Sequence, residues 1–373
     1  MTDSSSLARS TAFAPLTGVR VLDFSHVIAG PFATFLLAQM GAEVTKVESV
    51  DGDVMRRTER GRQGFVSLNA GKRCITVDLA TEEGRRQALA LASASDVVLD
   101  NLRPGVLERF GLGFDDVRAA HPGVVYCAIS GFGRGHDDWR HRPAYDHVVQ
   151  AVSGMAWLGG SEGDPPMKTG FPVVDSATGM LAAMAILAAL RERDRTGSGM
   201  LIDVSMVGAG LQLMYPMACD ALTSGTTPPR VGNQGYSGSP SADFFPARNG
   251  WLALGANTPR QLLAVLRTLG LGHLADDPAV FEQPLSGDVP VAFVRARDPA
   301  ALKRALAEAI AEQDAADLEA RLSACQVPAA RLRTLAEFAG EACANGCLPA
   351  VALQGDGISV QSPGLGFGVY RPS

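Results

Sequence analysis

The fold is decided by the stretch Val19-Arg20-Val21-Leu22-Asp23-Phe24, an apolar run that predicts a buried strand at the start of a βαβ unit. Pro31 to Met40 predicts a helix with a proline in its first turn, and Ala42 to Glu48 predicts a second strand. The connecting turn, Ser25 to Gly30, contains one glycine, so the Gly-x-Gly-x-x-Gly turn of dinucleotide-binding enzymes is missing. The sequence therefore argues against an enzyme that transfers hydride with a nicotinamide cofactor.

Strands and helices keep alternating over the next 180 residues. Further strands are expected at Cys74–Leu79, Asp96–Asp100, Val124–Ser130 and Leu201–Met206, and helices at Gly84–Ala94, Val106–Phe110, Asp115–Ala120, from Asp175 to about Arg193, and from the last strand to about Leu222. This alternation predicts an α/β fold, a Rossmann-like large domain whose parallel sheet is covered on both faces. Ligands gather beyond the carboxyl ends of such strands, where Ser25–Gly30, Asn101–Gly105 and Gly131–Arg134 are expected to lie.

A second unit is expected after residue 222, where breaker-rich sequence predicts a linker or functional loop over residues 223–242. Asn249-Gly250 between two apolar runs predicts a hairpin, and helices are expected at Thr258–Leu269, Ala300–Glu312 and Asp314–Ala324. We therefore expect a large domain over residues 1–222, a smaller α+β domain over 243–328, and a segment over 329–373 that returns to the large domain.

Composition excludes several classes of protein. Apolar residues make up 46% of the 373 and charged ones 19%, with a net charge of −6, which describes a globular chain and argues against binding to nucleic acid. The six scattered cysteines predict free thiols and no metal site. Met1 to Pro15 has no apolar core, and the run Met180 to Leu190 is about half the ~20 residues that span a bilayer, so a cytoplasmic protein without membrane contact is expected.

One acid stands out in Gly170-Phe171-Pro172-Val173-Val174-Asp175-Ser176-Ala177-Thr178-Gly179. Asp175 falls where a long apolar helix should begin, among unpaired N–H groups that favour an ionised carboxylate. Taken alone, the pattern is more typical of a helix cap than of a reacting group. Because no nucleophile elbow, His-Glu-x-x-His motif or Walker loop is present, a carboxylate is the best candidate for chemistry, as a base or as a nucleophile toward an activated acyl group.

A series of short motifs, each weak alone, is specific in its order and spacing. They are Leu16–Ser25 with Ala29-Gly30-Pro31, Gly41–Glu48, Asn69–Arg73, Asp100–Gly105, Ile129–Gly133, Arg142–Asp146 and Asp175–Gly179. On these motifs the chain resembles, along nearly its whole length, the class III CoA-transferases, the formyl-CoA transferase and carnitine CoA-transferase family.

The resemblance implies that Asp175 attacks the carbonyl of an acyl-CoA, that CoA returns to give an aspartyl-CoA thioester, and that CoA then passes to a carboxylic acid. CoA is then a substrate, and no permanently bound cofactor is expected. The resemblance also implies an interlocked, ring-like homodimer. The residues implied to contact CoA are Ile28, Ala29, Asn101, Leu102, Arg103 and Arg109, with Tyr145 and Asp146 at the thioester end.

The chain departs from the formyl-CoA transferases around the nucleotide. Ser49 and Ala80 stand where those enzymes carry an arginine and a lysine, and Arg56, Arg57 and Arg60 are the candidates to compensate. The glycine-run loop that covers their active site is also missing, with residues 235–241 as the nearest candidate. Lys168 and Arg142 are candidates to select a dicarboxylate.

Other readings stay open. Arg103 and Arg109 also suit surface cations, Asn101 a turn and Tyr145 a core aromatic. The 2-methylacyl-CoA racemases carry a catalytic His at the position of Tyr145, and His147, two residues along, is expected to face another way on a helix. A CoA-binding protein without activity is the third reading.

Overall fold

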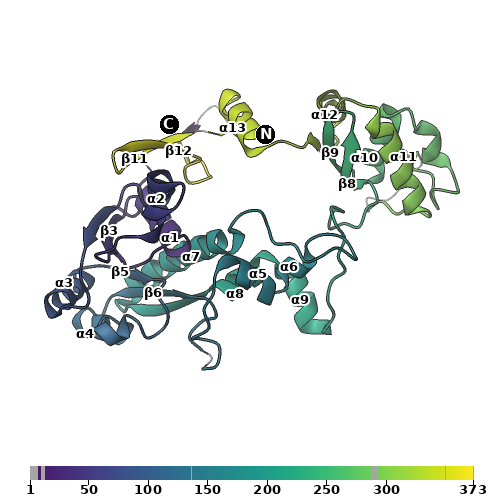
Figure 1. Cartoon of the computed structure of the whole chain (residues 1–373). Helices are drawn as coiled ribbons and strands as arrows, with labels where there is room; N and C mark the ends of the chain where they lie inside the picture. Colours follow the sequence, from purple (N-terminus) through teal and green to yellow (C-terminus); the bar gives the residue numbers. More distant parts are fainter. Residues whose placement is uncertain (1–6, 10–12, 136, 287–292, 349, 373) are drawn as a thin grey trace. The chain divides into compact units, whose positions relative to one another are not determined.

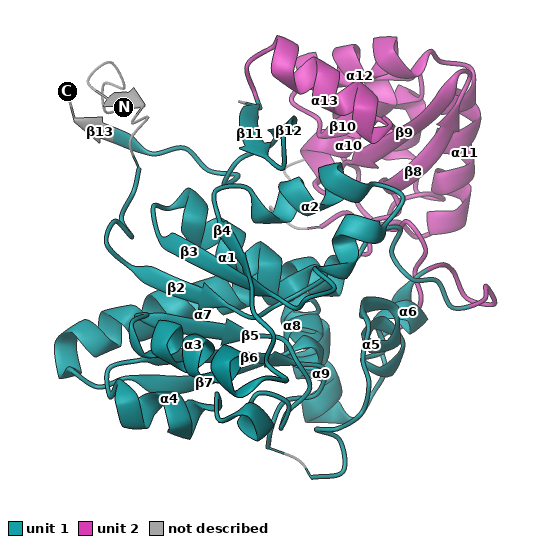
Figure 2. Ribbon diagram, turned by 60° about the vertical axis from the view of Figure 1, so that its left-hand side comes forward, with its two compact units in different colours: residues 1–159, 166–228, 348–373 teal, residues 160–165, 229–347 magenta. Residues whose placement is uncertain are grey.

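The computed structural model describes residues 7–9, 13–135, 137–286, 293–348 and 350–372 (Figure 1). Most of the N-terminal stretch 1–15, expected to be neither signal nor anchor, lies outside them. The chain forms two compact units (Figure 2). Unit 1 comprises residues 1–159, 166–228 and 348–373, and unit 2 comprises residues 160–165 and 229–347.

Unit 1 is built on a six-stranded parallel sheet in the order β4-β3-β2-β5-β6-β7. The strands are β2 (Arg20–Asp23), β3 (Glu43–Glu48), β4 (Arg73–Thr76), β5 (Val97–Asp100), β6 (Val125–Ser130) and β7 (Met200–Ser205). The chain runs outward from β2 to β4 and then returns to the other side of β2 as β5. The order reverses between β2 and β5, which makes their carboxyl ends the switch point of a doubly wound sheet. The α/β prediction is confirmed.

Alternate residues of each strand feed two apolar layers, one on each face of the sheet. On one face Val21, Leu99 and Cys127 pack with α1 (Ala29–Gln39) and α7 (Val173–Thr196). On the other, Leu22 and Val98 pack with α3 (Glu82–Ser93) and α4 (Phe114–Ala120). The sheet is therefore covered on both faces, as its apolar strands require.

Helix α7 is longer than the apolar run expected from the sequence. Its 24 residues include an 18-residue window of mean hydropathy 1.9, so length and composition alone would let it cross a bilayer. The inner face packs on α1, where a Cβ on Gly179 would lie 2.7 Å from the Ala29 carbonyl oxygen. The outer face leaves Met180 and Met184 more than half exposed. The helix ends at Gly197, whose φ is +75°.

The remaining elements of unit 1 surround the sheet. They are η2 (Val54–Arg57), α2 (Gly61–Asn69), η3 (Glu108–Phe110), α5 (Asp146–Val152), α6 (Met155–Leu158), α8 (Met206–Leu213), α9 (Tyr215–Ser224), the hairpin β11 (Val351–Gly355) and β12 (Ile358–Ser362), and the pair β1 (Leu7–Arg9) and β13 (Tyr370–Pro372). The single helix expected up to Leu222 is two, α8 and α9. Pro216 explains the break, because it lacks the N–H that would continue the first helix.

Unit 2 is a three-stranded antiparallel sheet, β10-β9-β8, packed with helices. Its elements are β8 (Ala242–Ala247), β9 (Gly250–Gly255), α10 (Pro259–Thr268), η4 (Gly272–Asp276), α11 (Pro299–Ala311), α12 (Ala315–Ala324), β10 (Ala329–Arg331) and α13 (Leu335–Ala344). In the β8–β9 hairpin Ala247 pairs with Gly250, so the loop is Arg248-Asn249 and Gly250 already belongs to β9.

The boundaries of the small unit differ from those expected. Because β10 pairs with β9 over Ala329–Arg331, the unit continues to Cys347, and only residues 348–373 of the expected return segment belong to unit 1. Residues 229–242, expected as linker, also belong to unit 2. The expected linker differs from the structure at Ser239 and Ser241, which are serines typical of a loop. In the structure both are buried and donate hydrogen bonds to the Ala256 carbonyl.

Candidate active site

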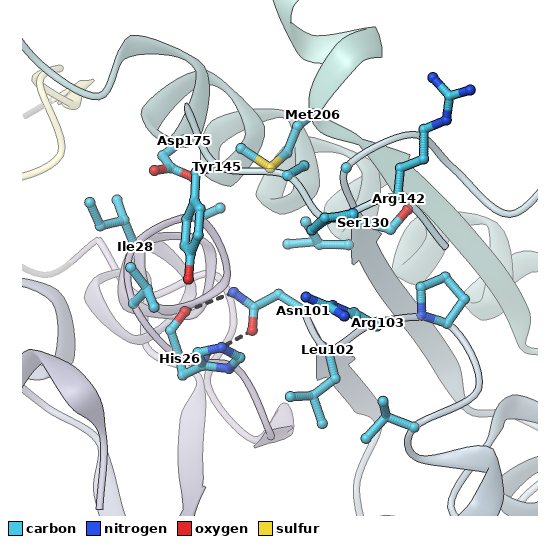
Figure 3. Close-up of a pocket in the computed structure, with 18 of the residues that line it drawn as sticks. His26, Ile28, Asn101, Leu102, Arg103, Ser130, Arg142, Tyr145, Asp175 and Met206 are labelled. Atoms are coloured by element: carbon cyan, nitrogen blue, oxygen red, sulfur yellow. Dashed lines mark hydrogen bonds between the residues drawn. The ribbon is translucent and has the colours of Figure 1, made fainter. Parts of the chain in front are cut away.

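An asparagine joins the loops that leave β2 and β5 at the switch point. Asn101 Oδ1 accepts a hydrogen bond from His26 N at 2.9 Å, and Asn101 Nδ2 donates to His26 O at 2.7 Å (Figure 3). The backbone extends this link, because Phe24 N donates to Leu99 O at 2.8 Å. The loops of two strands that are 75 residues apart in sequence are thereby fixed to one another.

The loop after β2 contains a strained residue. Val27 has φ +69°, a left-handed conformation that a β-branched side chain rarely adopts. Helix α1 begins two residues later with Ile28 as its N-cap, so no side chain caps it, and its first turn contains no acid. Residues 27–29 therefore line a cavity with backbone and apolar side chains at a helix N-terminus that has no competing acid.

A buried ion pair supports this loop from below. Lys72 Nζ lies 3.1 Å from Asp23 Oδ2 and donates to Pro31 O at 2.9 Å, with both side chains fully buried. Thr34 also donates to Asp23, at 2.6 Å. Burial alone would raise the pKa of Asp23, but the Lys72 and Lys46 charges and the hydroxyl groups lower it to about 2. The charge holds the end of β2 against the first turn of α1.

A second buried lysine extends the support. Lys46 Nζ donates to Ser25 O at 2.5 Å and lies 3.0 Å from Asp53 Oδ2, with 1% of each side chain exposed. The loop thus rests on two ammonium groups, one on each side of Asp23.

The cavity at the switch point has a volume of about 360 Å³. Its wall comes from six segments of unit 1, and its lining residues are His26–Ala29, Asn101–Pro104, Val106, Ile129–Gly131, Arg140, Arg142–Tyr145, Asp175 and Met206. A carboxylate, two joined loops and three arginines therefore share one space.

Asp175 lies in the first turn of α7, as expected, but not among unpaired N–H groups. Asp146 Oδ2 accepts from Val174 N at 2.8 Å and from Asp175 N at 3.1 Å, while Val173 N and Ser176 N donate to the carbonyls of Phe171 and Pro172. Burial and the Asp146 charge raise the pKa of Asp175 to about 6. The expectation that this position favours the ionised form is therefore wrong, because the carboxyl group is largely buried and a second carboxylate already caps the helix.

Most of the implied CoA contacts line the same cavity. Ile28, Ala29, Asn101, Leu102, Arg103 and Tyr145 do so, together with Asp175. Arg109 and Asp146 do not line it. Arg109 belongs to η3, the helical turn that follows the loop after β5, and Asp146 is turned toward the backbone of α7.

Tyr145 and His147 lie on the same side of α5. Their rings are parallel, with an interplanar angle of 4° and centroids 6.5 Å apart. Tyr145 is the N-cap of α5 and has an extended backbone, with φ −133° and ψ 163°, so helical spacing does not separate it from His147. The expectation that His147 faces another way is thus wrong.

Two cations suggested for dicarboxylate selection differ in position. Arg142 lines the cavity and lies 4.1 Å from the Trp139 ring centre, but its guanidinium points away from Asp175 (Figure 3). Lys168 does not line the cavity, and its ammonium donates to Thr169 O. His26 lies within Ser25–Gly30, one of the ranges expected at the ligand site, but Ser130 and Arg140 were not predicted to line it.

A second cavity, of about 420 Å³, adjoins the first and shares His26 and Leu102 with it. It lies beyond β3 and β4, where Ser49 and Ala80 form part of its wall. Arg56 does not reach into it, because its guanidinium binds Glu48 and Asp356 at 2.9 Å and covers the Phe65 ring.

The chain is similar in sequence to known proteins. Residues 16–363 match the family model described as CoA-transferase family III. The chain is 34% identical over 340 residues to a succinyl-CoA:mesaconate CoA-transferase of Haloarcula hispanica, covering 87% of this chain and 81% of the relative. It is 37% identical over 290 residues to an acyl-CoA transferase of Fusarium pseudograminearum, covering 74% of this chain but 63% of that protein.

A solved structure has the same fold over most of the chain. The crystal structure of a CAIB/BAIF family protein from Brucella suis has a TM-score of 0.79 and 30% identity, covering 91% of this chain and 89% of that one. Both the sequence match, from the first motif to the C-terminal hairpin, and the shared architecture point the same way. The chain belongs to CoA-transferase family III.

Proposed function

We propose that this protein transfers CoA from an acyl-CoA thioester to a carboxylic acid, with Asp175 as the nucleophile. The observation that carries the proposal is the single cavity that Asp175 shares with the loops after β2 and β5. Names of relatives support the reaction class, since one is a succinyl-CoA:mesaconate CoA-transferase. A carboxylate needs an activated acyl group to react as a nucleophile, and a thioester, with thiolate as leaving group, is one.

The steps balance without water or any further reactant. An Asp175 oxygen attacks the thioester carbonyl, the C–S bond breaks, and CoA thiolate leaves a mixed anhydride. The thiolate attacks Cγ of Asp175, which releases the donor acid and leaves an aspartyl-CoA thioester. The acceptor carboxylate attacks the same Cγ and displaces the thiolate, which then takes the acceptor's acyl group and frees Asp175.

The raised pKa of Asp175 suits this role. With a pKa of about 6 the carboxylate is mostly ionised at pH 7, yet it is a stronger base than an ordinary aspartate.

We place the thioester end of CoA in the cavity with Asp175 and the nucleotide in the adjoining cavity beyond β3 and β4. The two cavities meet at His26 and Leu102, where the pantetheine arm would cross between them. Ile28 and Ala29 contribute little side-chain bulk there, and Arg103 offers a guanidinium for a phosphate. The first acids to assay are dicarboxylates, because the Haloarcula relative is named for succinyl-CoA and mesaconate.

We also propose that the protein is a homodimer. Unit 1 exposes large apolar side chains on α7, α8 and α9, among them Met184 at 62%, Leu213 at 48% and Leu222 at 84% exposure. Apolar surface of this extent is typical of interfaces. Sedimentation equilibrium is expected to show dimer without folded monomer on dilution, and a stable monomer would refute the proposal.

One observation favours a second candidate, a 2-methylacyl-CoA racemase. The His147 ring stacks on Tyr145, so an imidazole lies next to the wall of the cavity that contains Asp175. A racemase would exchange the α-proton of its acyl-CoA with solvent deuterium without moving CoA between acids. We expect the reverse: transfer without exchange.

Asp175→Asn tests the proposed reaction. The variant should lose turnover by at least 1,000-fold while it keeps its affinity for CoA, since the amide cannot form the anhydride. Asp194→Asn is the matched control, because Asp194 lies on the same helix with its side chain 58% exposed. Unchanged turnover in Asp175→Asn would overturn the proposal.

A further inference from the structure

We propose that Asp146 is a positioning residue for Asp175, which fixes the first turn of α7 and brings a negative charge next to the reacting carboxylate. The inference rests on the proposed role of Asp175. It also changes the role of Asp146 itself, from a contact with the thioester to a group that acts through the helix.

One oxygen of Asp146 holds the backbone on which Asp175 is carried. Asp146 Oδ2 accepts from Val174 N and Asp175 N, at 2.8 and 3.1 Å. No side chain of α7 caps these groups, since its N-cap is Pro172. The turn that carries Asp175 is thus fixed from another helix, and removing this acceptor frees two N–H groups at once.

The other oxygen is fixed in turn. Gln150, fully buried and one turn along α5, donates from Nε2 to Asp146 Oδ1 at 2.5 Å and to Thr169 Oγ1 at 3.0 Å. Its Oε1 accepts from Thr169 N at 2.9 Å, and the threonine hydroxyl donates to Phe171 O. The same hydrogen-bond network therefore also holds Thr169 and Phe171, which precede α7. Asp146 is thereby kept next to the first turn that carries Asp175.

The arrangement has an electrostatic consequence. Two carboxylates joined through a helix turn repel one another, and together with burial this raises the pKa of Asp175 to about 6. The other charged or titratable side chains that line the cavity are His26, Arg103, Arg140, Arg142 and Tyr145. His147 stacks behind Tyr145. Of the charges around Asp175, that of Asp146 is the one that acts on its pKa.

The test is the pH profile of kcat/KM for CoA transfer in Asp146→Asn. The amide keeps an oxygen for the two N–H groups but removes the charge. Activity of the unchanged protein should fall as pH drops through about 6, because a protonated Asp175 cannot attack. In Asp146→Asn this acid limb should move to lower pH, while staying above the ordinary 3.8 because burial remains. We expect kcat to fall by about tenfold or more with KM nearly unchanged.

Two further variants complete the experiment. Asp146→Ser, a neutral residue that also caps helices, should shift the limb in the same direction. Asp298→Asn is the matched control, because Asp298 in unit 2 caps α11 by accepting from Ala301 N at 2.8 Å. In this variant the acid limb of the pH profile should be unchanged.

The outcomes separate the two proposals. If Asp175→Asn stays active, the proposed function fails and the inference falls with it. If Asp175→Asn is inactive while Asp146→Asn and Asp146→Ser keep the unchanged limb and kcat, only the inference is wrong. Two other outcomes would overturn the positioning role of Asp146. One is a loss of kcat in proportion to the unfolded fraction with the acid limb of the pH profile unchanged, and the other is failure of both Asp146 variants to fold.

Discussion

The buried ion pair under the β2 loop gives the most quantitative prediction. Lys72→Met removes an ammonium group that lies 3.1 Å from Asp23 and also donates to Pro31 O and Asn69 Oδ1. Asp23 would remain buried, with its Oδ2 paired to Thr34 and with Lys46 as the remaining neighbouring charge. Removing one member of a buried pair typically costs about 3–5 kcal/mol, because the other charge loses both water and partner.

The pKa values of the pair show both sides of this balance. The neighbouring lysine charges outweigh burial and lower the pKa of Asp23 to about 2, whereas burial outweighs Asp23 and lowers the pKa of Lys72 to about 8. We therefore expect Lys72→Met to lower the free energy of unfolding of unit 1 by about 3 kcal/mol at pH 7. In the unchanged protein this contribution is present above about pH 4 and is lost as pH falls toward 2, since the folded pKa lies below the unfolded one.

Urea titration followed by circular dichroism measures the effect, with the transition of unit 1 read separately from that of unit 2. The gap between Lys72→Met and the unchanged protein should narrow as pH falls from 7 to 4, because the unpaired Asp23 takes up a proton. Asp23→Asn with Lys72→Met should be more stable than Lys72→Met alone. Arg86→Met, which breaks an exposed pair, is the control and should cost less than about 1 kcal/mol. A loss below about 1 kcal/mol for Lys72→Met, or one independent of pH, would refute the reasoning.

Three further predictions follow from the same structure. Asn101→Leu removes both hydrogen bonds to the His26 backbone, each worth about 1 kcal/mol, and should weaken CoA binding about 10- to 30-fold by calorimetry; unchanged affinity would show that the loops do not need this link. Gly179→Ala should destabilise by about 1–3 kcal/mol, since its Cβ would lie 2.7 Å from Ala29 O and 3.0 Å from Phe32, as urea titration would show. Gly340→Ala on exposed α13 meets nothing within 4 Å and should instead stabilise by about 0.5–1 kcal/mol in the same titration; equal signs for the two glycines would contradict the packing of α7 on α1.

Periodicity was sufficient to predict the parallel sheet but not the boundaries of the second unit. Strands β2, β5 and β6 are short and mostly apolar between turn residues, and β3 alternates apolar and polar residues, so the order of strands and helices could be read directly. Helix α2 has no such signal, because Gly61 and Gly64 weaken its helical pattern, and its Val66 packs in an apolar cluster with the distant Phe35 and Leu353. Strand β10 has three residues, too few to recognise without its partner β9.

The sequence was sufficient to locate the candidate site, but it did not predict the direction of the Asp175 pKa shift. Asp175 and the loops at the strand ends carry local signals, a helix start and a strand end. Asp146 caps α7 by accepting hydrogen bonds from Val174 and Asp175, which follow it by 28 and 29 residues. The sequence around Asp175 contains no signal that predicts this contact. The expected direction of the Asp175 pKa shift was wrong because burial and the charge of Asp146 both raise the pKa, and a rule about helix termini includes neither.

The central claim is that an Asp175 oxygen becomes covalently bonded to an acyl group released from CoA. Its most direct test is to incubate the protein with succinyl-CoA, trap with hydroxylamine, and identify the modified residue by peptide mass spectrometry. We predict a hydroxamate on Asp175, which requires both succinyl-CoA and an intact carboxylate and is absent from Asp175→Asn. Trapping at any other residue, or turnover without a trappable carboxylate, would contradict the proposed reaction.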